Sequence, residues 1–147
     1  MRVGKRLGQI FRIPLDDEKW TYGIIIFESK RIKDGVLIGI YDALSTSEHD
    51  ELNDVECGKK SLLEAPNYTS VKIISKGDWP LVSTNRELAE AIELPVLRVA
   101  YSLFEGDEEI SRINALQATS YPTQQGQGKL VVENRARHLL GLRVQAN

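Results

Sequence analysis

The sequence has few of the side chains that enzymes most often use for nucleophilic and acid–base catalysis. Its 147 residues include one cysteine, Cys57, and two histidines, His49 and His138. A single cysteine excludes a disulfide within the chain and fits a reducing compartment. The spacing of His49 and Cys57 allows a Cys–His pair, but an exposed loop histidine and an inert buried cysteine explain the same residues more simply. We therefore predict that the protein is not an enzyme.

Long apolar runs are also missing. The longest, Gly23–Phe27, is far shorter than the roughly 20 residues that cross a bilayer as a helix. The segment 1–8 carries basic residues but lacks the apolar core of a signal peptide. We expect a cytoplasmic protein without a membrane partner.

The chain has no excess of basic residues. Its formal net charge is −2, whereas a dedicated nucleic-acid binder usually carries a clear positive excess. Charged and hydrophobic residues make up 27% and 41% of the sequence, which is typical of a folded globular protein. Nucleic acid is therefore disfavoured as a partner.

Metal and cofactor patterns are absent from the sequence as well. His49, Asp50, Glu51 and Asp54 lie close together, but their spacing fits neither a calcium loop nor a paired zinc motif. The glycines within 126–128 lack the preceding strand and the third glycine of a dinucleotide-binding motif. We expect no metal and no cofactor.

The chain is organised around the stretch Gly8–Phe27. Two apolar runs rich in β-branched and aromatic residues flank the charged segment Asp16–Lys19, a pattern that predicts an antiparallel hairpin. Pro14 belongs at a strand end or an edge, and Gly23 indicates a bulge, a bend or a close backbone approach. After an Asp-Gly turn, Val36–Tyr41 is apolar almost throughout, which predicts a third, central strand.

The middle of the chain predicts shorter elements. Ser45 and Glu48 have the spacing of a capping box that opens a short helix. Residues 70–75 predict a fourth strand and 79–82 a short edge segment. Thr84 is expected to cap a helix with Glu87 as its reciprocal partner, and the apolar face of this helix would hold Leu88, Ala91 and Ile92.

The last third predicts two further strands and a final helix. The strands are expected at 97–104 and 110–119, followed by a mobile loop at 121–129. Ala136, Leu139 and Leu140 share one helical face, and Gly141 stands where a helix C-terminus favours glycine. Together the elements predict an α+β fold that is mainly β. We expect a twisted antiparallel sheet or a partly open small barrel with one or two peripheral helices.

Two acidic clusters are the clearest pattern that a fold alone does not require. Such runs are most often solvated loops, but a negative patch also speeds association with a basic partner and selects it. Trp79 is by default a core residue, and beside acids at a surface it would serve as an interface anchor. The residues predicted to bind a partner are Glu48, Asp50, Glu51, Asp54, Glu56, Trp79, Glu105, Asp107, Glu108 and Glu109.

Several short motifs resemble one known family. The stretch 8–15 reads Gly-Gln-Ile-Phe-Arg-Ile-Pro-Leu, and Tyr22-Gly23 opens an apolar strand after the charged turn. The third strand ends in Tyr41-Asp42, and Gly77–Val82 contains a Trp-centred segment. These features, within residues 8–95, resemble the bacterial immunity proteins of the family numbered 26. We expect one domain over residues 1–147, with a basic arm at 1–7, this best-matched region, and a C-terminal β/helix extension at 96–147.

The resemblance implies a protein encoded beside a polymorphic toxin. Such a protein binds its cognate toxin and neutralises it by occluding the active site or the substrate surface. Many of these toxins are nucleases with basic grooves, where an acidic inhibitor would mimic the phosphate backbone. The alternative is a small β-barrel module that binds peptide or nucleic acid through its hairpin edge. In that alternative the basic arm Arg2–Arg6 or the helix around Arg135 makes the contacts.

Overall fold

The predicted hairpin lies at the centre of the fold. A computed structural model describes residues 2–145 of the chain. In it β1 (Gln9–Asp16) pairs antiparallel with β2 (Lys19–Glu28) across a turn at residues 17–18. A Cβ atom at Gly23 would come within 2.5 Å of the Phe11 ring, so the close approach predicted at this glycine is confirmed. Pro14 lies near the turn, beyond the part of β1 that pairs with a second neighbour.

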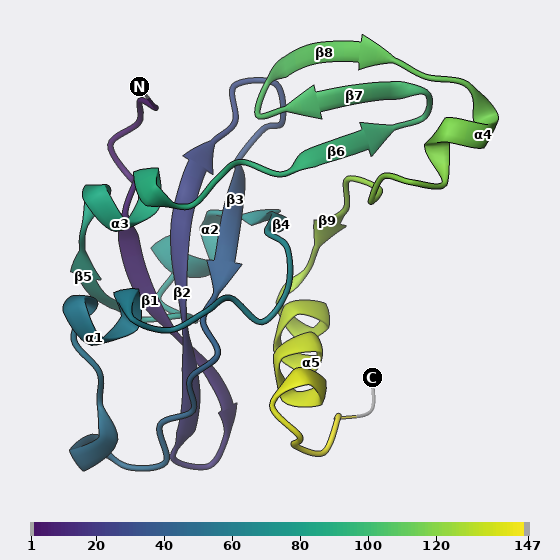
Figure 1. The fold of residues 1–147 in the computed structure, drawn as a ribbon. Coiled ribbons are helices and arrows are strands. Elements are labelled where there is room, and N and C mark those ends of the chain that lie inside the picture. The colour runs from purple at the N-terminus through teal and green to yellow at the C-terminus, as the bar shows by residue number, and fades with distance from the viewer. Residues whose placement is uncertain (1, 146–147) are drawn as a thin grey trace.

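The hairpin belongs to a six-stranded sheet with the strand order β5-β1-β2-β3-β4-β9 (Figure 1). Its neighbouring strands are antiparallel, except that β9 runs parallel to β4. β3 is buried along its whole length between β2 and β4, which confirms the prediction of a central strand. The other strands are β3 (Gly35–Ile40), β4 (Asn67–Ser70), β5 (Leu81–Thr84) and β9 (Gly126–Gln127).

A smaller antiparallel sheet extends beyond one end of the main sheet (Figure 1). It contains β6 (Val96–Val99), β7 (Ser102–Glu105) and β8 (Glu108–Arg112). The single strand predicted over 97–104 is therefore wrong. The chain reverses at Ala100, whose φ of 53° lies in the left-handed region, and the two halves pair as a hairpin.

The helices within residues 2–145 are all short. They are α1 (Asp54–Gly58), α2 (Lys72–Ser75), α3 (Arg86–Ala91), α4 (Ala115–Ala118) and α5 (Lys129–Leu139), with a 3₁₀ turn η1 (Glu48–Asp50). Gly141 follows α5 with a φ of 77°, which confirms its predicted place beyond a helix end. The mainly β class is confirmed: residues 2–145 form two open sheets and five short helices, without a closed barrel. None of the described helices is long and apolar enough to span a membrane.

Helix starts differ from the predicted capping residues. Asn85, not Thr84, caps α3, and its side chain accepts a hydrogen bond from the Leu88 amide. Ala89 is buried in the core, whereas Ala91, predicted on the apolar face, is exposed. The first helix likewise begins at an Asn53–Glu56 capping box and not at the predicted pair Ser45 and Glu48.

Three further segments differ from the sequence predictions. The strand predicted at 70–75 is mostly α2, because β4 ends at Ser70 and the short apolar run that follows fits a helical turn equally well. The strand predicted at 110–119 ends at Arg112, and an Asn114–Gln117 capping box opens α4. The loop predicted at 121–129 contains β9.

Both faces of the main sheet are covered. Ile24 of β2 packs in one apolar cluster with Ala89 of α3, and the next residue, Ile25, packs in a second cluster with Ile74 of α2 and Val132 of α5. This alternation follows from the period of two along a strand. The core therefore fixes the loops that leave the sheet at either end.

Residues 2–7 of the predicted basic arm are docked on this core. The Arg2 guanidinium donates hydrogen bonds to the carbonyls of Ile26, Ala89 and Ile92. Leu7 is completely buried. Ala89 and Ile92 lie at the C-terminal end of α3, where the free backbone carbonyls of a helix interact favourably with a cation.

Candidate functional site

The first acidic cluster lies on the loop that follows β3 and contains η1 and α1. We call Glu48, Asp50, Glu51, Asp54 and Glu56 the acidic loop surface. All of these side chains are exposed except that of Asp54, which is half-buried. Asp50, Glu51 and Glu56 border a shallow hollow of about 450 Å³, which is also lined by His49, Leu52 and Lys60. The arrangement presents several carboxylates to solvent on one side of the molecule.

A buried hydrogen-bond chain ties this loop to the main sheet. The Tyr22 hydroxyl accepts hydrogen bonds from Trp20 Nε1 and from the Leu52 amide, each at 2.9 Å. Its own proton goes to Ser45 Oγ at 2.9 Å, because Ser45 Oγ donates in turn to the Asp50 carbonyl. The Trp20, Tyr22 and Ser45 side chains of this hydrogen-bond chain are all paired, which favours one fixed conformation of the loop.

The acids themselves make local contacts that hold their positions. Glu51 forms an ion pair with Arg12, whose guanidinium also lies 4.5 Å from the centre of the Trp20 ring. Asp54 accepts a hydrogen bond from Asn85 Nδ2 at 2.8 Å, and Asp50 accepts one from Thr46 Oγ1 at 2.8 Å. Glu56 completes the capping box of α1. These contacts orient the carboxylates while leaving the surface negatively charged.

Replacing Tyr22 with phenylalanine should test this support. The change removes the acceptor of the Trp20 indole N–H and of the Leu52 backbone amide, and we expect a loss of about 2–3 kcal/mol in the free energy of unfolding. Urea unfolding measures the loss, and amide exchange at Leu52 reports the loosened loop. Tyr68→Phe is the matched control, because the buried Tyr68 hydroxyl donates a long bond of 3.4 Å to the Gly106 carbonyl and, among the described residues, otherwise meets only the side chains of Ser29 and Arg31. An equal loss in the two variants would contradict the role given to Tyr22.

The second acidic cluster lies at the β7–β8 turn, at the opposite end of the main sheet (Figure 1). Asp107 is engaged in the fold, since its carboxylate accepts hydrogen bonds from Ser29 Oγ and the Lys30 amide, both at 2.6 Å. Glu109 pairs with Arg112 at 3.3 Å. Glu105 and Glu108 are exposed. The structure does not bring the two acidic clusters together into one surface.

Trp79 is not exposed for contact with a partner. Its inclusion among the predicted partner-binding residues is therefore corrected, and its default place in the core holds. It is completely buried and stacks on Phe11 with ring centres 5.5 Å apart. Its Nε1 donates to Glu133 Oε2 at 3.0 Å, and Lys129 pairs with the same oxygen at 2.9 Å. Trp79 therefore joins α5 to the sheet.

Cys57 and His49, the two residues considered for catalysis, differ in their exposure to solvent. Cys57 is completely buried, and this burial raises the pKa of its thiol to about 11, so the reactive thiolate is disfavoured. His49 is exposed on η1. Within residues 2–145, no group of three or more His, Cys, Asp or Glu side chains could hold a metal ion.

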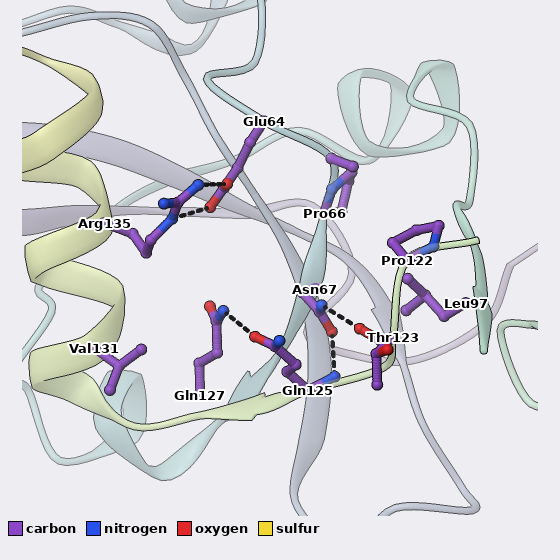
Figure 2. A pocket seen from close by; sticks show the side chains of 11 residues that line it. Glu64, Pro66, Asn67, Leu97, Pro122, Thr123, Gln125, Gln127, Val131 and Arg135 are labelled. Carbon is purple, nitrogen blue, oxygen red and sulfur yellow. Dashed lines mark hydrogen bonds and ion pairs between the residues drawn. The ribbon is translucent and has the colours of Figure 1, made fainter. Parts of the chain in front are cut away.

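A second hollow, of about 520 Å³, lies between β4, β9, the start of α5 and the base of the small sheet (Figure 2). We call it the amide hollow, after Asn67, Gln125 and Gln127. Its rim carries an ion pair between Arg135 and Glu64, and the bond to Glu64 raises the pKa of Arg135 above its ordinary value. Its lining residues are Glu64, Ala65, Pro66, Asn67, Leu97, Pro122, Thr123, Gln125, Gln127, Val131 and Arg135.

Sequence reasoning missed the amide hollow, because its walls come from segments far apart in the chain. Residues 122–127 have the composition of a loop, and only their pairing with β4 places their side chains beside Asn67. The one local indication is the alternation of Thr123, Gln125 and Gln127, which puts three polar side chains on one side of an extended segment.

The sequence was compared with protein families, with curated proteins and with solved structures. One family model, described as Immunity protein 26, matches residues 6–106. No curated protein and no solved structure matches the chain. The matched range contains the whole acidic loop surface and ends inside the β7–β8 turn, whereas the amide hollow is built partly from residues beyond it.

Proposed function

Because the chain belongs to the Immunity protein 26 family, we propose that it binds a cognate polymorphic toxin in the cytoplasm and neutralises it. The single observation that carries this proposal is the family match over residues 6–106. The inhibitor covers the active site or the substrate surface of the toxin and performs no chemistry itself. The buried thiol of Cys57 and the isolated, exposed His49 agree with a binding role.

We place the contact with the toxin at the acidic loop surface. Its carboxylates are exposed or half-buried, three of them border a hollow, and the Tyr22 hydrogen-bond chain holds their loop in place. A preformed negative surface suits a toxin with a basic substrate groove, as in a nuclease, because complementary potentials speed the encounter and limit the choice of partner. A loop that is already ordered also loses little conformational entropy on binding.

The alternative, a module that binds peptide or nucleic acid through basic groups, has less support. Arg2 is occupied by backbone carbonyls of β2 and the end of α3. Arg135 is paired with Glu64. Two of the basic groups that this alternative names are therefore already engaged within the fold.

Co-expression tests the proposed function. The toxin domain encoded beside this chain's gene is induced in a bacterial host, with or without this protein. We expect growth arrest with the toxin domain alone and normal growth when both are present. A toxin domain from an unrelated system is the control, and the chain should give no protection against it. Growth arrest that persists although the protein is folded and abundant would refute neutralisation.

A further inference from the structure

The amide hollow is concave and its walls are fixed. Asn67 Nδ2 donates to the Thr123 backbone carbonyl at 3.2 Å, and Asn67 Oδ1 accepts from the backbone N–H of Gln125 at 3.0 Å. Thr69 Oγ1 donates to the Gln127 carbonyl at 2.7 Å. These bonds clamp residues 123–127 to β4 from both sides of Gln125. A ligand would therefore meet a site that needs little rearrangement.

Two side-chain amides face the hollow with hydrogen-bonding capacity to spare (Figure 2). Gln127 Nε2 donates to Gln125 Oε1 at 3.0 Å, which orients both groups. Among the described residues, Gln125 Nε2 and Gln127 Oε1 have no hydrogen-bond partner. A free donor and a free acceptor on adjacent side chains match a peptide group, which offers one acceptor and one donor.

The rest of the lining favours an uncharged occupant. The carboxylate of Glu64 and the guanidinium of Arg135 already neutralise each other, so a buried charge from a ligand would find no free counter-charge. Pro122 and Val131, which are both exposed, supply apolar contact. Val131 is 53% exposed, so its surface is available for burial.

We propose that the amide hollow receives a short uncharged segment of the toxin chain, whose peptide group bonds to Gln125 and Gln127. This inference rests on the proposed function. It adds a second contact of different chemistry, because the acidic loop surface attracts the toxin by charge and the hollow recognises backbone and shape.

The range of the family match, residues 6–106, supports a role for this contact in selecting the toxin. Glu64–Asn67 and Leu97 lie within the matched residues 6–106, whereas the opposite wall, residues 122–135, lies outside them. One wall thus belongs to the family architecture and the other to this chain's own C-terminal segment. The hollow discriminates the cognate toxin from toxins of related systems.

Affinity measurements by surface plasmon resonance test the hollow, with a catalytically inactive form of the toxin domain encoded beside this gene as the probe. Val131→Arg places a long charged side chain at the hollow, and we expect it to weaken binding at least about tenfold. The double variant Gln125→Ala/Gln127→Ala removes the free donor and acceptor without adding bulk, and we expect weakening of about tenfold from two lost hydrogen bonds.

Leu139→Arg is the matched control. Leu139 lies on the same helix, is 37% exposed and does not line the hollow, so this variant should bind as the unmodified protein does. Thermal unfolding shows whether each variant is folded, and the double variant supplies the test if Val131→Arg is not. Unchanged affinity in a folded hollow variant would overturn the inference and leave the proposed function standing. Failure of the unmodified protein to bind the toxin would overturn both.

Discussion

Replacing the acids of the acidic loop surface with their amides is expected to slow association with the toxin by about 10- to 100-fold at low ionic strength. The variant is Glu48→Gln/Asp50→Asn/Glu51→Gln/Asp54→Asn/Glu56→Gln. Each amide keeps an acceptor oxygen, so the bonds from Thr46 and Asn85 and the α1 capping box are retained. The exposed Glu51–Arg12 pair is lost at little cost in stability.

Stopped-flow kinetics at several salt concentrations measure this effect. The difference between the variant and the unmodified protein should shrink as salt is added, because screening removes steering. The control is Glu105→Gln/Glu108→Gln/Glu109→Gln, at the opposite end of the main sheet, which should leave the association rate close to that of the unmodified protein. An equal slowing by both variants would show that net charge matters and that the acidic loop surface has no special role. No slowing in either would remove the electrostatic account of the interface.

Replacing Trp79 with alanine is expected to lower the free energy of unfolding by about 3–5 kcal/mol. The change leaves a cavity against Phe11 and takes the indole donor away from Glu133, which is 4% exposed. A buried carboxylate that loses a hydrogen bond carries an additional desolvation cost. Urea unfolding gives the magnitude.

Trp79→Phe separates the packing from the hydrogen bond. It keeps an aromatic ring against Phe11 and loses only the donor and part of the volume, so we expect a loss of about 1–2 kcal/mol. If Trp79→Ala instead unfolded like the unmodified protein and lost only toxin binding, Trp79 would be an interface anchor and its assignment to the core would be wrong.

The central hairpin was predictable because its information is local. Two apolar runs around Asp16–Lys19 and an apolar third strand after Asp34-Gly35 define three strands and their order along the sheet. The left-handed φ of 57° at Asp34 agrees with that turn. The close approach at Gly23 also follows locally, since a glycine inside an apolar strand leaves space that a facing ring can fill.

The short elements were not predictable from local pattern. Residues 70–75 form a helical turn because β4 loses its partner there, and β9 exists only because residues 126–127 reach β4 from far along the chain. Both depend on tertiary pairing that a short sequence window does not contain. The amide hollow shares this origin, since its two walls meet only after the chain has folded.

The binding site was predictable in part. The sequence identified the acids, but not that Asp107 fastens the β7–β8 turn to the β2–β3 loop or that the two acidic clusters lie at opposite ends of the main sheet. Tryptophan is also a residue type that often anchors interfaces, and the burial of Trp79 depends on the position of α5. Charge and aromaticity are visible in a sequence, whereas exposure is a property of the whole fold.

One measurement tests the central claim most directly: a calorimetric titration of this protein into the toxin domain encoded beside its gene, with toxin activity followed in the same samples. We predict tight 1:1 binding and a loss of toxin activity that reaches completion at equivalence. An absence of binding heat together with undiminished toxin activity, from protein shown to be folded, would contradict the assignment of this chain as the inhibitor of that toxin.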